Sequence, residues 1–356
     1  MSAPTRTIVL GGTGYVAGEL LRLLAVHPFL REVAVISESQ PGKRVEEVFP
    51  HLAGAFPDLV FQGGESLERL VGENDHVAVF SAAPHGASAP LLDRVLDQAE
   101  RSGARANLVD LSADFRYPTA LEYERVYGHP HGAPGRIGTF VSAVPELATG
   151  PGFAGARHVC LPGCFTTAVL LAVVPLLRLG LIEPRFSVVA VTGSTGAGRT
   201  PTATTHHPER RSNVFAYNPL GHRHEPEMRL HASAAAGAPV EIAFVPQSGP
   251  YARGIYATIQ ARTARPTTTA QAVAELAAFY AGSPFVAVGE KPPRLQDVAG
   301  TNRARIGLAV RGDDLVAFSA IDNLVKGAAG GGVQWMNRLL DLPEVSGLAQ
   351  PGLGWI

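Results

Sequence analysis

The chain has 356 residues, which is too long for one ordinary domain and suits two. Hydrophobic residues make up 46% and charged residues 17%, so the chain can bury a substantial core, and this composition argues against wholesale disorder. The formal net charge is -1, and no long run of like charge occurs. This balance argues against a nucleic-acid partner and against a polybasic membrane surface.

Cysteine usage and the lack of targeting patterns restrict the class of protein further. No stretch approaches the roughly 20 apolar residues that a membrane span needs, and residues 1–6 lead into a strand-like run without a signal-peptide pattern. Cys160 and Cys164 are too few for a disulfide framework or a structural zinc site. We therefore expect a cytoplasmic enzyme with no membrane or nucleic-acid partner, no bound metal and at most one special thiol.

The first third of the chain alternates short β-rich runs with segments of helical length. This alternation predicts a parallel, doubly wound sheet. We expect strands at 7–10, 33–37, 77–81 and 107–111, and helices at 18–27 and 87–101.

A Gly- and Pro-rich stretch at 148–156 interrupts this rhythm and predicts a boundary region. After it, strands follow one another without regular helices between them, which favours a mixed or antiparallel sheet and an α+β second domain. We expect strands at 187–191, 240–246, 254–264, 306–310 and 315–321, helices at 166–179, 269–280 and 327–340, and an irregular tail from 343.

A glycine-rich turn follows the first expected strand and opens the first expected helix. Small residues there let the backbone approach a pyrophosphate, whose charge is favoured by the N–H groups of the helix start. The spacing G-x-x-G-x-x-x-G differs from the commonest dinucleotide fingerprint, but the strand–turn–helix context favours a nucleotide site. The residues expected to contact the cofactor are Gly11, Thr13, Gly14, Tyr15 and Val16.

The end of the second strand is where such a site reads the ribose. Glu38, which follows Ser37, suits a 2′-hydroxyl and so favours NAD, or it is simply a solvated loop carboxylate. A 2′-phosphate would require a cation, and Lys43 and Arg44 are the cations nearby in the sequence. Both interpretations of Glu38 stay open.

Cys164 immediately precedes the apolar helix expected at 166–179. A thiol at a helix start is favoured as thiolate by backbone N–H groups and by the helix dipole. The same N–H groups could stabilise the oxyanion that forms when the thiolate attacks a carbonyl. The alternative is a small core residue, and Cys160 fits that alternative better.

Two clusters of ionisable residues could supply a proton partner for the thiol. The first is His206-His207-Pro208-Glu209-Arg210-Arg211, and the second is Gly221-His222-Arg223-His224-Glu225-Pro226-Glu227. We expect His222 and His224 to share one side of an extended segment, with Arg223 pointing the other way and Glu227 orienting an imidazole. A metal site is disfavoured by the arginines, and a polar surface loop is the plainer alternative.

Two further segments suit an anionic substrate. The loop at 193–199 follows a strand and offers N–H donors and Arg199, and the segment 110–116 lies at the carboxyl end of a sheet strand. From these segments and the histidine cluster, the expected substrate contacts are Ser112, Arg116, Arg199 and Arg223.

Together, these motifs resemble the N-acetyl-γ-glutamyl-phosphate reductase family, which includes reductases that act on carrier-linked 2-aminoadipate 6-phosphate. The resemblance covers nearly the whole chain in order. The combination of P-G-C and H-R-H-x-P-E is specific, whereas the glycine turn alone is not. The matching segments are the turn from Gly11, 110–116, 162–164, 193–199, 222–227 and 321–327.

The resemblance implies a Rossmann domain at 1–158, completed by a C-terminal helix in 322–356, and an α+β catalytic and dimerisation domain at 159–321. It implies that Cys164 attacks an acyl phosphate and that NADPH reduces the resulting thioester. His224 would handle the proton, with His222 as its substitute and Glu227 as its orienter. It also implies cofactor contacts by Ser37, Pro84, Gly196 and Asn323, and a homo-oligomer, either a dimer or a tetramer.

Two departures from the family pattern bear on cofactor and substrate. Where the family often has Ser-Arg, this chain has Ser37-Glu38, so NAD stays possible beside NADP. The two histidine clusters look closer to the lysine-pathway branch, which would add an acidic amino-group carrier protein as partner, whereas L-P-G-C looks closer to the arginine branch. We expect the arginine branch, with aspartate-semialdehyde dehydrogenase as the nearest rival enzyme and a non-catalytic regulator as the rival outside enzymes.

Overall fold

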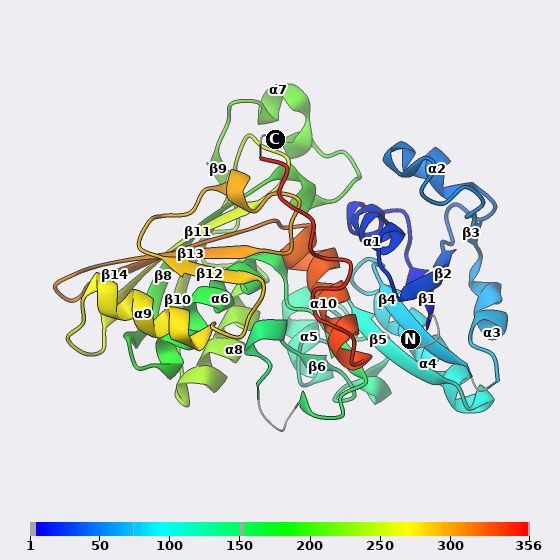
Figure 1. The fold of residues 1–356 in the computed structure, drawn as a ribbon, viewed down its shortest axis with the longest axis horizontal. Helices are drawn as coiled ribbons and strands as arrows, with labels where there is room; N and C mark the ends of the chain where they lie inside the picture. Colours follow the sequence, from blue (N-terminus) through cyan, green and yellow to red (C-terminus); the bar gives the residue numbers. More distant parts are fainter. Residues whose placement is uncertain (1–4, 74, 150–152, 355–356) are drawn as a thin grey trace. The chain divides into compact units, whose positions relative to one another are not determined.

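The computed structural model describes residues 5–73, 75–149 and 153–354, and its chain forms two compact units. The first unit runs to Pro162 and includes Ala328–Ala349, and the second comprises Gly163–Gly327 and the chain from Gln350. The elements of each unit are labelled in Figure 1. The expected domains, by contrast, divide at 158/159 and assign all of 322–356 to the first; those limits stay predictions. The stretches at 1–6, at 148–156 and at the tail lie partly outside the described residues.

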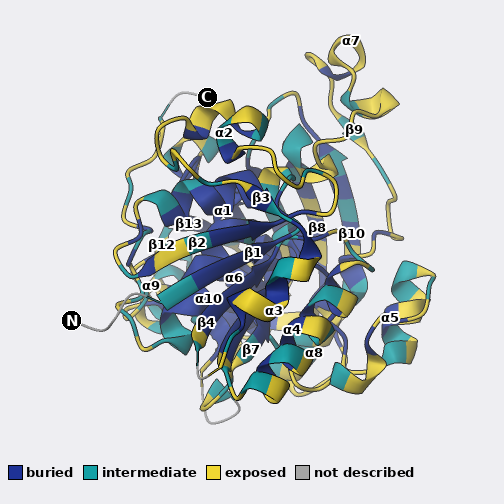
Figure 2. Ribbon diagram, turned by 90° about the vertical axis from the view of Figure 1, so that its right-hand side faces the viewer, coloured by how far each residue is buried: buried dark blue, intermediate teal, exposed yellow. Residues whose placement is uncertain are grey.

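The first unit is built on a seven-stranded sheet in which every described pairing is parallel. Its central strands are buried on both faces, as apolar runs in parallel sheets are, and they appear dark blue in Figure 2. The strand order is β3 (Phe61–Gln62), β2 (Leu30–Ile36), β1 (Thr5–Leu10), β4 (His76–Ser81), β5 (Arg105–Asp110), β7 (His158–Cys160) and β6 (Val141–Ser142).

The register of this sheet brings the ends of its main strands to one edge. Leu10 at the end of β1 pairs with Ile36 and Ser81, and Ser81 pairs with Asp110, which pairs with Cys160. The loops that leave these strands therefore start side by side at the carboxyl edge, where ligands of open parallel sheets bind. The four strands predicted for this region are confirmed within a few residues.

Three helices of the first unit were predicted from their amphipathic patterns, and three others were not. The sequence indicated α1 and α4 through their buried leucine stripes, whereas α2, α3 and α5 are too short or too polar to give a clear period. The helices are α1 (Tyr15–Ala25), α2 (Val45–Val48), α3 (Leu67–Leu70), α4 (Ser88–Ser102), α5 (Ala120–Tyr127) and α10 (Gly330–Leu339).

The second unit contains a seven-stranded sheet that is mixed, one of the two arrangements that the sequence predicted; β9 and β12 were not predicted. Parallel pairs join β8 to β10 and β12 to β13, and the other described pairings are antiparallel. The order is β12 (Val286–Gly289), β13 (Ala304–Arg311), β14 (Asp314–Ile321), β11 (Ile255–Thr263), β8 (Ile182–Thr192), β10 (Glu241–Ser248) and β9 (Phe215–Ala216).

Helix α6 (Cys164–Arg178) forms the centre of this unit. It packs against β8, β11, β13 and β14 and against two further helices, and nearly all of its residues are buried. Full burial of one Leu or Val side chain stabilises the fold by about 1.5–3 kcal/mol, so this helix is held rigidly at the residue where it begins. The remaining helices of the unit are α7 (His207–Arg210), α8 (Glu225–Ala236) and α9 (Thr269–Phe279).

One local prediction is wrong. Residues 221–224 are not an extended segment: they form turns that lead into α8, because Pro226 occupies the first helical turn, where its fixed φ favours a helix. The helix predicted at 327–340 is confirmed as α10, and a π-helical turn, Val325–Ala329, precedes it. No helix among the described residues is both long and apolar enough to cross a membrane.

Candidate active site

Cys164 is the first residue of α6, and Gly163 is its N-cap. The thiol is half-buried, whereas Cys160 is fully buried in the first unit. Backbone N–H groups of a first helical turn favour negative charge on a group held there. The predicted place of Cys164 at a helix start is confirmed, and its role as nucleophile stays a prediction.

Glu227 holds the turn that carries Cys164. Its two carboxylate oxygens accept hydrogen bonds from the Gly163 N–H at 3.2 and 3.3 Å, and one of them accepts from Thr166 Oγ1 at 2.9 Å. Only 1% of Glu227 is exposed, so these bonds form where water does not compete. The carboxylate therefore ties α8 to the start of α6, and its expected role of orienting an imidazole stays a prediction.

The imidazole of His224 lies against the backbone of Gly163. A Cβ atom placed on Gly163 would stand 2.5 Å from His224 Nε2 and 2.7 Å from Cε1, closer than real Cβ contacts come. Glycine at this position is therefore what admits the ring beside the residue that precedes Cys164. His224 is almost fully buried and its ring lies edge-on to Phe165 at 6.1 Å.

His222 supports His224 from the preceding turn. Its Nδ1 accepts a hydrogen bond from the backbone N–H of His224 at 3.1 Å, and its ring packs edge-on against Phe165 and Phe244. Burial, and then the positive charge of Arg223, lowers the pKa of His222 to about 4. A neutral His222 is a poor proton donor at pH 7, so the geometry favours His224 for that role.

A glycine also permits the closest approach to Cys164 itself. A Cβ on Gly327 would stand 2.7 Å from Cys164 Cβ. The Gly327 N–H donates to Asp322 O at 3.0 Å, which is the i to i−5 bond of the π turn. π turns of this kind recur at functional sites, and this one sets the chain directly against Cys164.

The residues before this turn bind two loops of the second unit together. Asn323 accepts from the Gly254 N–H at 2.7 Å and donates to Thr195 Oγ1 at 3.0 Å. Asp322 pairs with Arg253 at 3.0 Å and accepts from the Gly300 N–H at 2.7 Å. Asn323 is thus a buried link to the loop that follows β8, and its expected position near a nicotinamide stays a prediction.

Tyr217 is a site residue that the sequence did not reveal. It is half-buried and its ring lies edge-on to His222 at 5.6 Å. Burial, and then the nearby charge of Cys164, raises the pKa of Tyr217, so its hydroxyl stays protonated and can donate. The available signal was an aromatic residue just ahead of the second histidine cluster, which is too weak to single out.

The other sequence-predicted residues of this unit lie at its surface. Gly196 and Arg199 are exposed in the loop after β8, and Arg223 is exposed between two buried histidines. His206 and His207 are also exposed. The structure therefore brings the second histidine cluster to Cys164 and leaves the first on the surface.

In the first unit, the glycine turn has the shape that a pyrophosphate requires. Gly11 has φ +72, and a Cβ there would stand 2.4 Å from Ala83 Cα. Gly14 is the N-cap of α1, and a Cβ built on it would meet no atom within 4 Å, which leaves open space before the first helical turn. Thr13, Tyr15 and Val16 lie in the same turn, so these residues fit a dinucleotide phosphate.

The remaining cofactor residues of this unit lie at the same edge. Ser37 is buried directly after β2, Glu38 is exposed beside it, and Pro84 is exposed after β4. Ser37 Oγ lies 3.3 Å from Ser39 Oγ. Their contacts with a cofactor stay predictions.

The segment at 110–116 forms a buried polar network. Asp110 accepts from Ser88 Oγ at 2.7 Å and from Ser112 Oγ at 2.9 Å, and burial raises its pKa to about 6. Asp114 accepts from the N–H groups of Gly86 and Ala89, at the start of α4. Bonds of this kind give Ser112 a structural role.

Arg116 is also buried. It donates to Leu161 O at 2.9 Å, which gives it a structural role as well. Substrate binding by Ser112 and Arg116 stays a prediction.

Comparison with known proteins gives two family matches that divide the chain. Residues 6–149 match a model described as semialdehyde dehydrogenase, NAD binding domain, and residues 164–323 match one described as semialdehyde dehydrogenase, dimerisation domain. Among curated relatives, the N-acetyl-γ-glutamyl-phosphate reductase of Ectopseudomonas mendocina is 40% identical and covers 97% of this chain and 98% of its own. That of Acidithiobacillus ferrooxidans is 38% identical, covering 98% and 99%.

Solved structures confirm the fold. Aspartate semialdehyde dehydrogenase II of Vibrio cholerae superposes with a TM-score of 0.70 at 18% identity, covering 96% of this chain and 99% of its own. Aspartate semialdehyde dehydrogenase of Candida albicans, solved with NADP, gives 0.65 at 16% identity, covering 95% and 99%. At these identities the likeness concerns the fold alone. The predicted fold class, a Rossmann domain with an α+β partner of the semialdehyde dehydrogenase type, is confirmed.

Proposed function

Because the chain belongs to the N-acetyl-γ-glutamyl-phosphate reductase family, we propose that it reduces N-acetyl-γ-glutamyl phosphate to N-acetylglutamate semialdehyde with NADPH, releasing phosphate, as a step of arginine biosynthesis. Relatives that carry this name match over nearly the full chain. The observation that carries the proposal is the Cys164 turn, where a thiol at a helix start lies next to the glycine that admits His224.

In this mechanism, Cys164 Sγ attacks the acyl carbon, the carbon–oxygen bond to phosphate breaks, and a thioester forms. N–H groups of the first turn of α6 stabilise the oxyanion at that carbon. A nicotinamide cofactor, whose pyrophosphate the turn from Gly11 to Gly14 would hold, would supply the hydride that reduces the thioester. His224 then manages the proton on the tetrahedral oxygen as the carbon–sulfur bond breaks and the aldehyde leaves. Glu227 and Gly327 keep the nucleophile in place, and the Tyr217 hydroxyl, whose pKa burial and then the charge of Cys164 raise, stays protonated as a donor.

A second substrate stays open on one observation. The clusters at 206–210 and 221–224 are similar in sequence to the lysine-pathway branch of the family. In that case the same chemistry would act on 2-aminoadipate 6-phosphate linked to an acidic carrier protein. Parallel assays with the free N-acetylglutamate semialdehyde and the carrier-linked aminoadipate semialdehyde distinguish the two substrates.

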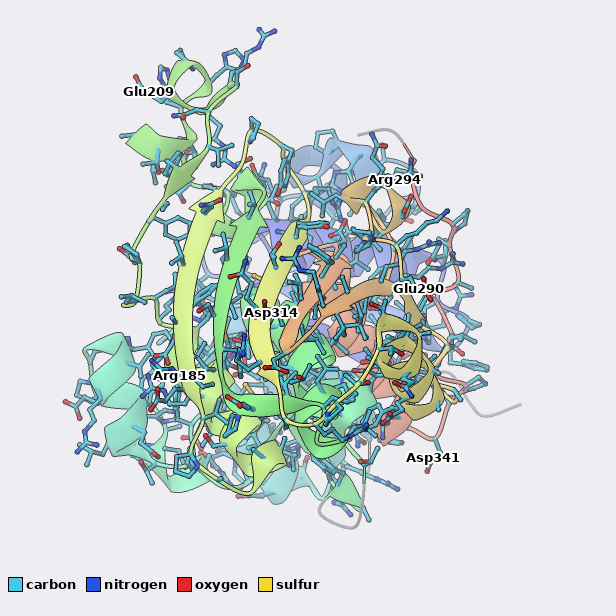
Figure 3. All side chains as sticks on the ribbon, turned by 90° about the vertical axis from the view of Figure 1, so that its left-hand side faces the viewer. Arg185, Glu209, Glu290, Arg294, Asp314 and Asp341 are labelled. Carbon is cyan, nitrogen blue, oxygen red and sulfur yellow. The ribbon has the colours of Figure 1, made fainter. Side chains whose placement is uncertain are left out.

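We also infer that the chain forms a homo-oligomer through its second sheet. The dimerisation-domain match covers this sheet, whose strands face the viewer in Figure 3, with Arg185 and Asp314 labelled on it. Exposed residues alternate with buried ones along β8, and Val189 is 41% exposed. An apolar residue presented in this way suits burial against a second copy. A dimer forms if this face alone pairs with a second copy. A tetramer forms if a second surface of each chain pairs as well.

We further propose that the enzyme works in the cytoplasm. Both cysteines are thiols in the structure, and the mechanism requires Cys164 to stay reduced. Reduced thiols persist in that compartment.

The experiment that tests the main proposal is phosphate-dependent oxidation of N-acetylglutamate semialdehyde by wild type, Cys164→Ser and Cys160→Ala. We expect Cys164→Ser to lose all activity and still bind cofactor, while Cys160→Ala keeps activity because its thiol lies in the core of the other unit. Activity in Cys164→Ser equal to that of wild type would contradict the covalent mechanism.

A further inference from the structure

Glu38 and Arg94 bring opposite charges together at the carboxyl edge of the first sheet. Strands β2 and β3 pair at Ile36 and Gln62, so the loops that leave them start side by side. Glu38 lies in the first loop and Gly64 in the second. A Cβ atom placed on Gly64 would stand 2.4 Å from Glu38 Oε1 and 3.1 Å from Arg94 Nη1. The carboxylate and the guanidinium therefore converge on the same small space above Gly64.

Arg94 reaches this place from α4 and is held there. Its Nη2 donates a hydrogen bond to Gly64 O at 3.0 Å, which fixes the guanidinium and directs Nη1 toward the space that Glu38 also borders. A guanidinium held by one bond loses less freedom when it binds a further anion. Arginine is also the side chain whose planar set of donors matches phosphate oxygens.

The other cations near this edge have different partners. Arg44 pairs with Glu46 at 2.8 Å, and Arg69 donates to Gln62 Oε1 at 2.9 Å. Lys43 is exposed in the loop before α2. Arg94 is distinguished from them because its guanidinium borders the same space as the Glu38 carboxylate.

The end of the second strand is where a Rossmann domain meets the adenosine ribose, and a carboxylate there accepts a hydrogen bond from the 2′-hydroxyl. The same carboxylate repels a 2′-phosphate unless a cation offsets its charge. We propose that Arg94 is the residue that admits a 2′-phosphate and Glu38 the residue that reads a 2′-hydroxyl, so that this chain binds both NADP and NAD. The inference rests on the proposed function only in taking the first unit to bind a nicotinamide dinucleotide.

Equilibrium binding of NADP and NAD by calorimetry, without substrate, tests this assignment. A hydrogen bond to a charged group contributes about 1.5–3 kcal/mol, so we expect Arg94→Gln to weaken NADP binding by about tenfold to a hundredfold. Binding of NAD should change less than about twofold. Glu38→Gln should act in the opposite direction, weakening NAD and strengthening NADP. Arg69→Gln, which removes the same charge beside β3, should change neither.

Equal weakening of both cofactors by Arg94→Gln, or no change in either, would overturn the role of Arg94. Unchanged binding of both cofactors by Glu38→Gln would overturn the role of Glu38. A wild-type protein that binds neither NADP nor NAD would instead overturn the proposed cofactor, and this inference with it. Because binding is measured without substrate, none of these outcomes depends on which acyl phosphate the enzyme reduces.

Discussion

Two histidine clusters that look alike in the sequence occupy different environments in the second unit. Each contains two histidines, a proline and at least one glutamate, and a helix begins within each, α7 in one case and α8 in the other. The first cluster is exposed except for Arg210, with Glu209 labelled on its projecting segment in Figure 3, and it is coloured mostly yellow in Figure 2. The second buries His222, His224 and Glu227.

The difference arises from the residues on the C-terminal side of each cluster. Helix α8 continues into Met228 and Ala232, which are fully buried and hold its first turn against α6. After α7 come Arg211, Ser212 and Asn213, which offer no apolar surface. Arg210 ties that segment to the end of β10, donating to Ser248 Oγ and Gly249 O, and burial lowers the pKa of its guanidinium. Histidines and glutamates of the second cluster are therefore held in a fixed arrangement by the apolar packing of α8, and those of the first cluster are not.

Replacing one histidine in each cluster gives the largest expected difference between the buried and the exposed cluster. We expect His224→Asn to lower kcat by about 10²–10⁴-fold, the usual contribution of a positioned acid–base group. His207→Asn, which removes an exposed imidazole at the start of α7, should change kcat for the free N-acetyl substrate by less than about twofold. The measurement is steady-state oxidation of the semialdehyde at several pH values. Comparable losses of kcat in the two variants would show that the buried cluster has no special role in catalysis.

Gly163→Ala tests whether the approach of His224 depends on the missing side chain. Gly163 has φ -56 and ψ 156, which alanine adopts without strain, and the three atoms nearest to the added methyl group all belong to the His224 imidazole. A displacement of about 1 Å can cost about 10²-fold in rate, and we expect a loss of kcat of that order with little change in cofactor binding. The pH dependence of Cys164 alkylation by iodoacetamide should shift as well, because the imidazole moves away.

Gly282→Ala is the matched control, since a Cβ on Gly282 meets no atom within 4 Å. It should leave both kcat and the alkylation profile unchanged. If Gly163→Ala behaves like this control, Gly163 has no part in positioning His224.

Much of this arrangement could be predicted from the sequence. The strands of both sheets have strong apolar runs, and the combination of Gly11–Gly14, Cys164 at a helix start and two histidines before a P-E pair indicated the chemistry. The close approaches could not be predicted, because the contact of Gly163 with His224 and of Gly327 with Cys164 joins residues far apart in the chain. The structural use of Glu227, Ser112 and Arg116 was hidden for the same reason: residue type does not reveal which backbone groups a side chain satisfies.

The smallest expected effect concerns stability and distinguishes the two clusters by pH. Burial holds the pKa of His222 near 4 in the folded chain, against an ordinary value of 6.5. Above pH 6.5 the ring is neutral in both states and adds no pH dependence. Between pH 6.5 and 4 the unfolded chain binds the proton more readily, so the free energy of unfolding falls by up to about 3 kcal/mol as the pH is lowered.

Replacing His222 by Gln should therefore flatten the decline of Tm between pH 6.5 and 4, whereas replacing the exposed His206 by Gln should leave the slope of wild type. Thermal unfolding of the three proteins across this range measures the difference. Because a neutral His222 is the state that accepts the His224 N–H, the catalytic turn should keep this support until the pH approaches 4, well below the pH at which Tm begins to fall. Identical slopes in all three proteins would mean that His222 is not held neutral by burial, and that both clusters are equally open to solvent.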